Sequence, residues 1–116
     1  MRPVEPGRGP APVGDLRSRV VLWLPQEAAD GFGGVRTTYA AGPALWARVT
    51  PLRSAGTPDA AAPGQLVIHR VEIRWRDGIG TGHRIGLGAR RLAVRAAFDP
   101  DERRRRLVLL CEEIRP

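Results

Sequence analysis

The sequence predicts an all-β fold, namely a small antiparallel β-barrel of about six or seven strands with a long flexible loop and a disordered N-terminal arm. Three observations support this class. Short runs of β-branched and other apolar residues recur along the chain, turn residues separate them at intervals of roughly 8–12 residues, and no window keeps a helical period. This combination is typical of a compact barrel or sandwich of antiparallel strands.

The size of the chain permits one domain with a thin core. Of the 116 residues, 42% are hydrophobic but only 5% are aromatic, and a short chain with few large rings buries limited apolar area. We therefore expect an arm over residues 1–14 and a single domain over residues 15–116, stabilised further by partners or self-association. No apolar run is long enough for a membrane helix, and we expect no secretory signal.

The N-terminal half is expected to contain the arm and two strands joined by a turn. Residues 1–14 hold four prolines and three glycines, and such a segment buries too little apolar surface to offset the entropy of ordering. The run RVVLWL favours a strand over residues 16–24, which Pro25 is expected to end. The glycine-rich residues 30–34 mark a turn, and a short strand follows over residues 35–40.

The remaining chain alternates between strands and turns. Residues 44–52 should form a strand, and residues 53–64 should form the long loop because they lack periodicity and bulk. Residues 65–76 are the clearest strand, since apolar and polar side chains alternate along them. Further strands are expected over residues 83–87, 92–98 and 106–114, with a plain hairpin at residues 99–105. The side chains expected on one face of the 92–98 strand are Leu92, Val94, Ala96 and Phe98.

Positive charge is a strong compositional signal. The net charge is +7, and all 19 basic residues are arginine. Arg103 to Arg106 are consecutive, but three acidic residues precede them, so we interpret the segment as a solvated, partly self-neutralised hairpin. Contact with an acidic partner and direct DNA contact are the alternatives. The arginines considered for partner contacts are Arg17, Arg19, Arg103, Arg104, Arg105 and Arg106.

The alternative function is a nucleic-acid-binding small β-barrel that uses the Arg103–Arg106 cluster. Single-strand binders on small barrels also expose aromatic side chains, on which bases stack. The chain has only six aromatic residues, and several lie in strand runs where we expect the core to need them. The sequence therefore supports this function poorly.

No arrangement of residues indicates catalysis, a metal site or a cofactor. The adjacent Glu112 and Glu113 would point to opposite faces of a strand. His69 lies on the apolar face of the clearest strand and is interpreted as a hydrogen-bonded core or interface residue. Cys111 is interpreted as a buried thiol. The glycine-rich residues 78–82 lack the ending of a phosphate loop. We expect no enzyme activity and no cofactor.

Six short motifs follow one another in a distinctive order over residues 14–113. They are Gly14-Asp15-Leu16-Arg17-Ser18-Arg19-Val20, Asp30-Gly31-Phe32-Gly33-Gly34, Trp46-Ala47-Arg48-Val49-Thr50-Pro51, His69-Arg70-Val71-Glu72-Ile73-Arg74, Asp77-Gly78-Ile79, and Phe98 to Arg103 followed by Leu107 to Glu112. In this order they resemble the head-closure proteins of long-tailed phages and gene transfer agents, also called head–tail joining, connector or stopper proteins. The proline-rich arm and residues 91–94 depart from the usual pattern of that family.

The resemblance implies a structural function. Copies of the chain would form a homo-oligomeric ring of six or twelve subunits below the portal and its adaptor. The ring would close the DNA-filled head and dock tail terminator or tail-tube proteins. DNA would pass through the central channel without sequence-specific binding, and no membrane would be involved. The protein would lie at the head–tail interface of a virion or gene transfer agent particle, after assembly in the host cytoplasm.

By position, the resemblance also assigns the gate of the channel to the long loop. Its residues are Arg53, Ser54, Ala55, Gly56, Thr57, Pro58, Asp59, Ala60, Ala61, Ala62, Pro63 and Gly64. Small side chains suit a site where several copies converge on a symmetry axis. The single positive and single negative charge cancel, so the loop would neither clamp nor repel DNA, and its glycines and prolines allow ordered and retracted states.

Overall fold

The computed structural model describes residues 13–52 and 68–114, and these residues form one closed β-barrel. A short 3-10 helix, η1 (Val13–Asp15), precedes the strands. The strands in the described segments are β1 (Ser18–Ala29), β2 (Val35–Leu52), β3 (Ile68–Arg74), β4 (Arg84–Leu87), β5 (Arg90–Phe98) and β6 (Arg106–Ile114). The predicted all-β class is confirmed. Most of the expected arm and the expected loop over residues 53–64 lie outside the described residues.

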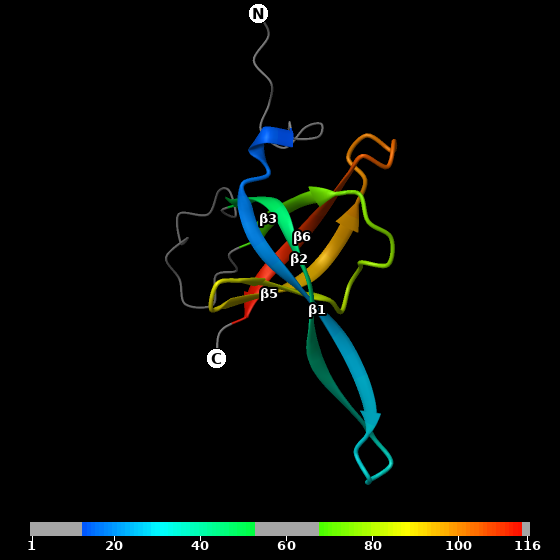
Figure 1. Cartoon of the computed structure of the whole chain (residues 1–116). Helices are drawn as coiled ribbons and strands as arrows, with labels where there is room; N and C mark the ends of the chain where they lie inside the picture. Colours follow the sequence, from blue (N-terminus) through cyan, green and yellow to red (C-terminus); the bar gives the residue numbers. More distant parts are fainter. Residues whose placement is uncertain (1–12, 53–67, 115–116) are drawn as a thin grey trace, which may run out of the picture.

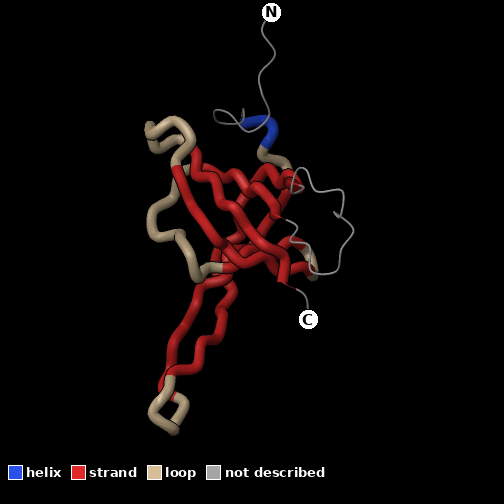
Figure 2. The backbone as a smooth tube through the Cα atoms, turned by 180° about the vertical axis from the view of Figure 1, so that it is seen from behind, coloured by secondary structure: helices blue, strands red, loops and turns tan. Residues whose placement is uncertain are grey.

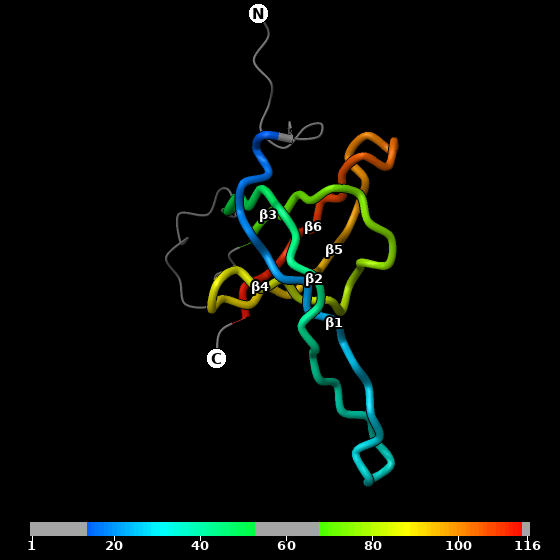
Figure 3. Tube along the Cα trace, in the orientation of Figure 1, coloured from blue at the N-terminus to red at the C-terminus, as the bar shows by residue number. Residues whose placement is uncertain are grey.

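The strands follow the order β1-β2-β3-β6-β5-β4 around the barrel, and every neighbouring pair is antiparallel. Figure 1 shows the barrel, and Figure 3 traces the chain through it. The connection from β3 to β4 joins strands that are not neighbours. Pairing of β1 residues 21–23 with β4 closes the barrel, and the β5–β6 hairpin forms as predicted.

Beyond the barrel, β1 and β2 continue as a long two-stranded ribbon that projects away from it (Figures 1 and 2). The prediction that Pro25 ends the first strand is wrong, because β1 continues to Ala29. Each strand of a two-stranded ribbon has one unpaired edge, and proline, which lacks an N–H group, is tolerated on such an edge. Residues 35–40 and 44–52 belong to one strand rather than two. Gly42 and Pro43 together oppose Leu22, which makes a β-bulge where the sequence suggested a break.

The barrel interior is filled almost entirely by aliphatic side chains. The buried cluster contains Val20, Leu22, Ala47, Val71, Ile73, Ile85, Leu92, Val94, Leu107, Leu109 and Cys111. Three aromatic residues that could have filled it are instead exposed, namely Phe32 at 94%, Trp46 at 52% and Phe98 at 41%. The expectation that Phe98 shares the face of Leu92 and Val94 is wrong, because a bulge between Val94 and Ala96 shifts the alternation.

Candidate interaction surfaces

The far end of the β1–β2 ribbon carries an exposed apolar side chain. Residues 26–29 of β1 and the facing start of β2 are exposed on both faces. At the turn between the two strands, Phe32 is the most exposed large hydrophobic residue of the described chain, and Val35 beside it is 64% exposed. We call residues 30–35 the ribbon tip.

The ribbon tip is held by its own hydrogen bonds. Asp30 Oδ1 accepts bonds from the backbone N–H groups of Phe32 at 2.7 Å and Gly34 at 3.0 Å. These bonds lower the pKa of Asp30 below its ordinary value, and the bond from Phe32 has the largest effect. The carboxylate is therefore ionised at neutral pH. Gly31 and Gly33 adopt φ values of 84° and 83°, which glycine reaches without strain. The turn therefore presents Phe32 in a defined conformation beside a negative charge.

A second apolar surface lies near the beginning of β1. A hollow of about 420 Å³ is lined by Leu16, Arg17, Trp46 and Arg74, and we call it the Trp46 hollow. The guanidinium of Arg19, which is the register partner of Trp46, lies over the indole ring at 4.9 Å from its centroid. Such a cation–π contact orients the ring and adds positive charge to the rim of the hollow.

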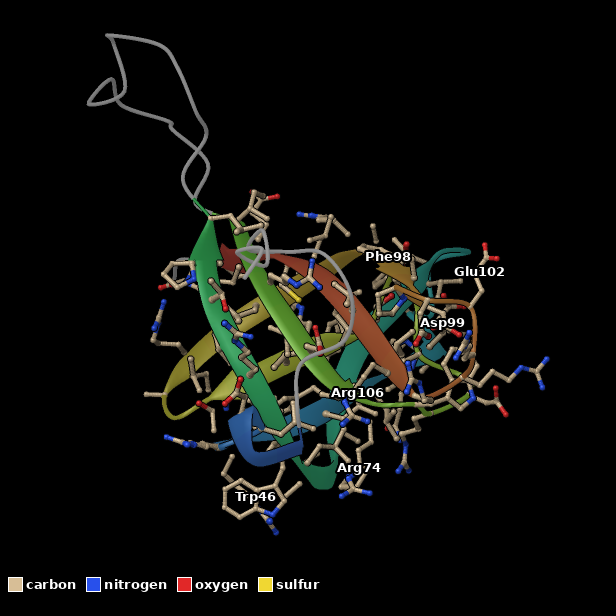
Figure 4. All side chains as sticks on the ribbon, turned by 90° about the horizontal axis from the view of Figure 1, so that it is seen from above. Trp46, Arg74, Phe98, Asp99, Glu102 and Arg106 are labelled. Carbon is tan, nitrogen blue, oxygen red and sulfur yellow. The ribbon has the colours of Figure 1, made fainter. Side chains whose placement is uncertain are left out.

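Two of the arginines predicted to contact partners belong to this second surface. Arg17 lines the hollow, and its Nε donates a hydrogen bond to the carbonyl of Gly14 at 2.7 Å. Arg19 stacks on Trp46. Arg106 lies close by, because it is the register partner of Arg74, and Figure 4 shows Arg74 between Trp46 and Arg106.

The other predicted arginines form the β5–β6 hairpin, whose turn is stabilised by its acidic residues. Asp99 Oδ2 accepts a bond from the backbone N–H of Arg104 at 2.7 Å, and Asp101 Oδ1 accepts one from that of Arg103 at 3.1 Å. Asp101 also forms an ion pair with Arg105, whose hydrogen bond is the main reason that the pKa of Asp101 is lowered. These contacts agree with a hairpin that partly neutralises itself.

A buried histidine, His69, lies at the end of the barrel where the undescribed segment 53–67 begins and ends. His69 is only 4% exposed, and Arg90 Nη2 donates to its Nε2 at 3.1 Å. Arg90 also forms an ion pair with Glu113. Among the described residues, His69 Nδ1 has no hydrogen-bond partner. His69 is therefore a buried, hydrogen-bonded histidine, as predicted.

The described chain shows no constellation for catalysis or metal binding. No group of three or more His, Cys, Asp or Glu side chains in the described segments is placed to hold a metal ion. Cys111 is fully buried, and burial raises the pKa of its thiol to about 12, so it stays protonated and unreactive. Glu112 and Glu113 make separate ion pairs, with Arg95 and Arg90. Within the described part, no helix is long and apolar enough to cross a membrane.

The sequence reasoning missed Phe32 and Trp46 as surface residues. A signal existed for Phe32, because a phenylalanine flanked by glycines inside a turn has no neighbouring strand residues with which to enter a core. Trp46 and Ala47 are neighbours in a strand, so their side chains must point to opposite faces. Because we expected aromatic residues in the core, we did not predict that Trp46 would be on the outer face. The predicted gate residues 53–64 lie outside the described part of the chain.

Comparison with known proteins identifies structural relatives. The solution structure of protein SF1141 from Shigella flexneri 2a is 29% identical, with a TM-score of 0.64 over 87% of this chain and 95% of that chain. A chain in the virion of a native gene transfer agent particle is 23% identical, with a TM-score of 0.67 over 84% of this chain and 94% of that chain. At this identity the second likeness shows the fold alone. No curated protein sequence matches the chain.

The family comparison covers nearly the whole chain. The model of the phage head completion protein family matches residues 11–114, which include all the strands described above. This match agrees with the resemblance carried by the six sequence motifs. The chain therefore belongs to the phage head completion protein family.

Proposed function

We propose that the chain is a non-catalytic subunit of a head–tail connector, which forms a ring below the portal and adaptor, closes the DNA-filled head and docks the tail. The observation that carries this proposal is the match of the head completion family over residues 11–114. The lack of a catalytic or metal-binding constellation in the described residues is compatible with it. The subunit would act through its surfaces and its position in the particle.

The distribution of apolar side chains supports an assembled state. The core is thin and aliphatic, while Phe32 and Trp46 are exposed at two separate places. Exposed aromatic side chains are enriched at protein–protein interfaces, where they bury large areas. A small domain that exposes its rings gains stability when copies or partners cover them.

We further propose, from the sequence, that residues 53–64 form the gate of the channel. In the described structure, Leu52 at the end of β2 and Ile68 at the start of β3 are register partners. The segment between them is therefore attached at two neighbouring points at one end of the barrel. In the proposed ring, a rigid barrel in the wall would hold both ends of the gate, and the small residues of the gate would project toward the axis.

The connector role is tested by removing the chain from cells that produce the particles. We expect DNA-filled or leaking heads without tails, because the surface that docks the tail is missing. Electron microscopy of the lysate measures the fraction of tailed particles, and addition of purified protein to the heads should restore tail attachment. A normal yield of tailed particles without the chain would contradict the proposal.

The gate is tested separately by replacing residues 53–64 with a short Gly-Ser linker. We expect the ring to assemble but packaged DNA to leak, which is measured as the share of DNA that becomes sensitive to nuclease. The matched control replaces Gly88-Ala89, between β4 and β5, with Gly-Ser, which leaves the gate sequence, the ribbon tip and the Trp46 hollow intact. Particles that protect their DNA fully without residues 53–64 would exclude the gate.

A further inference from the structure

The ribbon tip and the Trp46 hollow are two apolar surfaces that cannot meet within one chain. Arg19, the register partner of Trp46, and Ala29, the last residue of β1, are separated by about 33 Å of extended strand at roughly 3.3 Å per residue. β2 pairs with β1 along this length, so the ribbon cannot fold back. Any contact between the two surfaces must join different copies of the chain.

The two surfaces match in size and polarity. An enclosed cavity of roughly 150 Å³ accommodates a benzene molecule, and the Trp46 hollow, at about 420 Å³, has room for a phenyl ring and the backbone beside it. Leu16 and the indole of Trp46 supply apolar contacts. Aromatic rings in contact prefer offset or edge-to-face packing, and Phe32, which lies on a projecting turn, is free to adopt either arrangement against Trp46.

The charges of the two surfaces are opposite. Arg17 and Arg74 line the hollow and Arg19 lies on Trp46, so its surroundings are basic. The ribbon tip carries the Asp30 carboxylate, which accepts the bonds from Phe32 and Gly34 through Oδ1, so that neither of these two bonds uses Oδ2. A carboxylate that enters beside Phe32 would pair with an arginine at the rim, in the charge-assisted geometry that arginine favours.

We propose that Phe32 of one subunit inserts into the Trp46 hollow of a second copy, with Asp30 pairing at its arginine rim. This inference rests on the ring proposed above and names the contact between its subunits. Because tip and hollow are different surfaces of one chain, the contact is heterologous, and repetition with a closing rotation generates a ring. The ribbon would thus act as an arm that reaches across to the neighbouring barrel.

Crosslinking between engineered thiols tests this contact in purified particles. The chain carries Val35→Cys, at an exposed position of the ribbon tip that keeps Phe32 in place, together with Arg17→Cys, and it is treated with a short bis-maleimide. The native Cys111 is buried and should not react. We expect a ladder of covalent multimers of this chain on a denaturing gel. A control chain with Val35→Cys and Thr81→Cys, at an exposed residue that does not line the hollow, should give at least tenfold less multimer.

Truncation of the ring side chain provides an independent measurement. Phe32→Ala and Trp46→Ala should each lower incorporation of the subunit into particles about tenfold or more, whereas Phe98→Ala, at the other exposed phenylalanine, should change it less than twofold. Phe32 lies outside the buried core cluster, so the melting temperature of the isolated Phe32→Ala chain should equal that of the wild type. An unchanged incorporation of both variants would overturn the contact.

The outcomes separate this inference from the proposed function. Suppose that the chain is present at the head–tail junction, but the Val35→Cys/Arg17→Cys chain gives no ladder or its thiol at position 35 links to another particle protein. The contact is then wrong and the connector role stands. If particles lack the chain, the connector role is wrong. In that case, crosslinking of the concentrated isolated protein decides the contact, and only a ladder of this chain supports it.

Discussion

At the scale of single residues, the group around His69 places a titratable side chain inside the barrel. Burial, and next the positive charge of Arg90, lower the pKa of His69 below its ordinary value. Arg90 is itself held by Glu113, whose hydrogen bond raises the pKa of the guanidinium. The folded chain therefore favours the neutral imidazole, with Nε2 as the acceptor for Arg90.

This arrangement predicts that stability depends on pH through His69. The unfolded chain binds a proton near pH 6.5, while the folded chain resists it, so the stabilising contribution is complete above that pH and is lost as the pH falls below it. The free energy of unfolding should fall by at most about 1.4 kcal/mol per pH unit from this one proton. Urea denaturation between pH 5 and pH 8 measures the change.

The matched variants are His69→Leu and His69→Gln, which remove the titration with and without a polar group. Both should flatten the dependence between pH 5 and pH 7, whatever their effect on stability at pH 7. If His69→Leu and His69→Gln keep the slope of the wild type, another group causes it and our assignment to His69 is wrong.

The burial of an individual residue could be predicted from sequence where the pattern of its own strand determines which way its side chain points. His69 lies on the apolar face of an alternating strand and Cys111 ends an apolar run, and both are buried as expected. Phe98 was misplaced because the alternation changes at the bulge after Val94. A bulge inserts one residue without any requirement for glycine or proline, so Arg95 gave no signal of it.

At the scale of elements, the β1–β2 ribbon depends on the bulge where it leaves the barrel. A Cβ atom added at Gly42 would lie 2.9 Å from the carbonyl oxygen of Leu22 and 3.3 Å from Leu24 Cδ1. The first neighbour is backbone and cannot rotate away. Gly42 is thus needed for close approach of the two strands at the point where the ribbon departs.

We therefore predict that Gly42→Ala destabilises the fold by about 1–3 kcal/mol, the usual cost of an inserted methyl group in a tightly packed site. The control is Gly80→Ala, because a Cβ atom there meets nothing within 4 Å. Thermal or urea denaturation compares the two variants. Equal stabilities would show that the strands shift apart without cost, and would remove the structural requirement for Gly42.

The ribbon also shows why the strands were predicted better than their connections. All the observed strands overlap the expected ones, because each contains a β-branched or apolar run. Pro25 was expected to end a strand and residues 41–43 separated two expected strands, although all of these residues lie inside strands. Proline ends a central strand, but it is tolerated on a two-stranded ribbon, and the sequence alone does not show which strands leave the barrel.

At the scale of the whole molecule, the net charge of +7 is distributed rather than concentrated. In the Arg103–Arg106 run, Arg105 is paired with Asp101 and Arg106 is partly buried in β6. Arg17 and Arg19, at the beginning of β1, are exposed as well. A connector whose channel lets DNA pass needs weak, general attraction, whereas a nucleic-acid-binding barrel needs one dominant site.

These two functions predict different salt dependence for DNA binding by the isolated chain. Each lost phosphate contact lowers the slope of log K against log salt concentration by about 0.9. For the connector, the double variant Arg103→Ala/Arg104→Ala should weaken binding about as much as Arg17→Ala/Arg19→Ala, because each removes two exposed charges. Fluorescence anisotropy with duplex and single-stranded DNA between about 50 and 200 mM salt measures both. Loss of binding only on removal of Arg103 and Arg104 would favour the nucleic-acid-binding barrel, since general attraction cannot distinguish two equal charge changes.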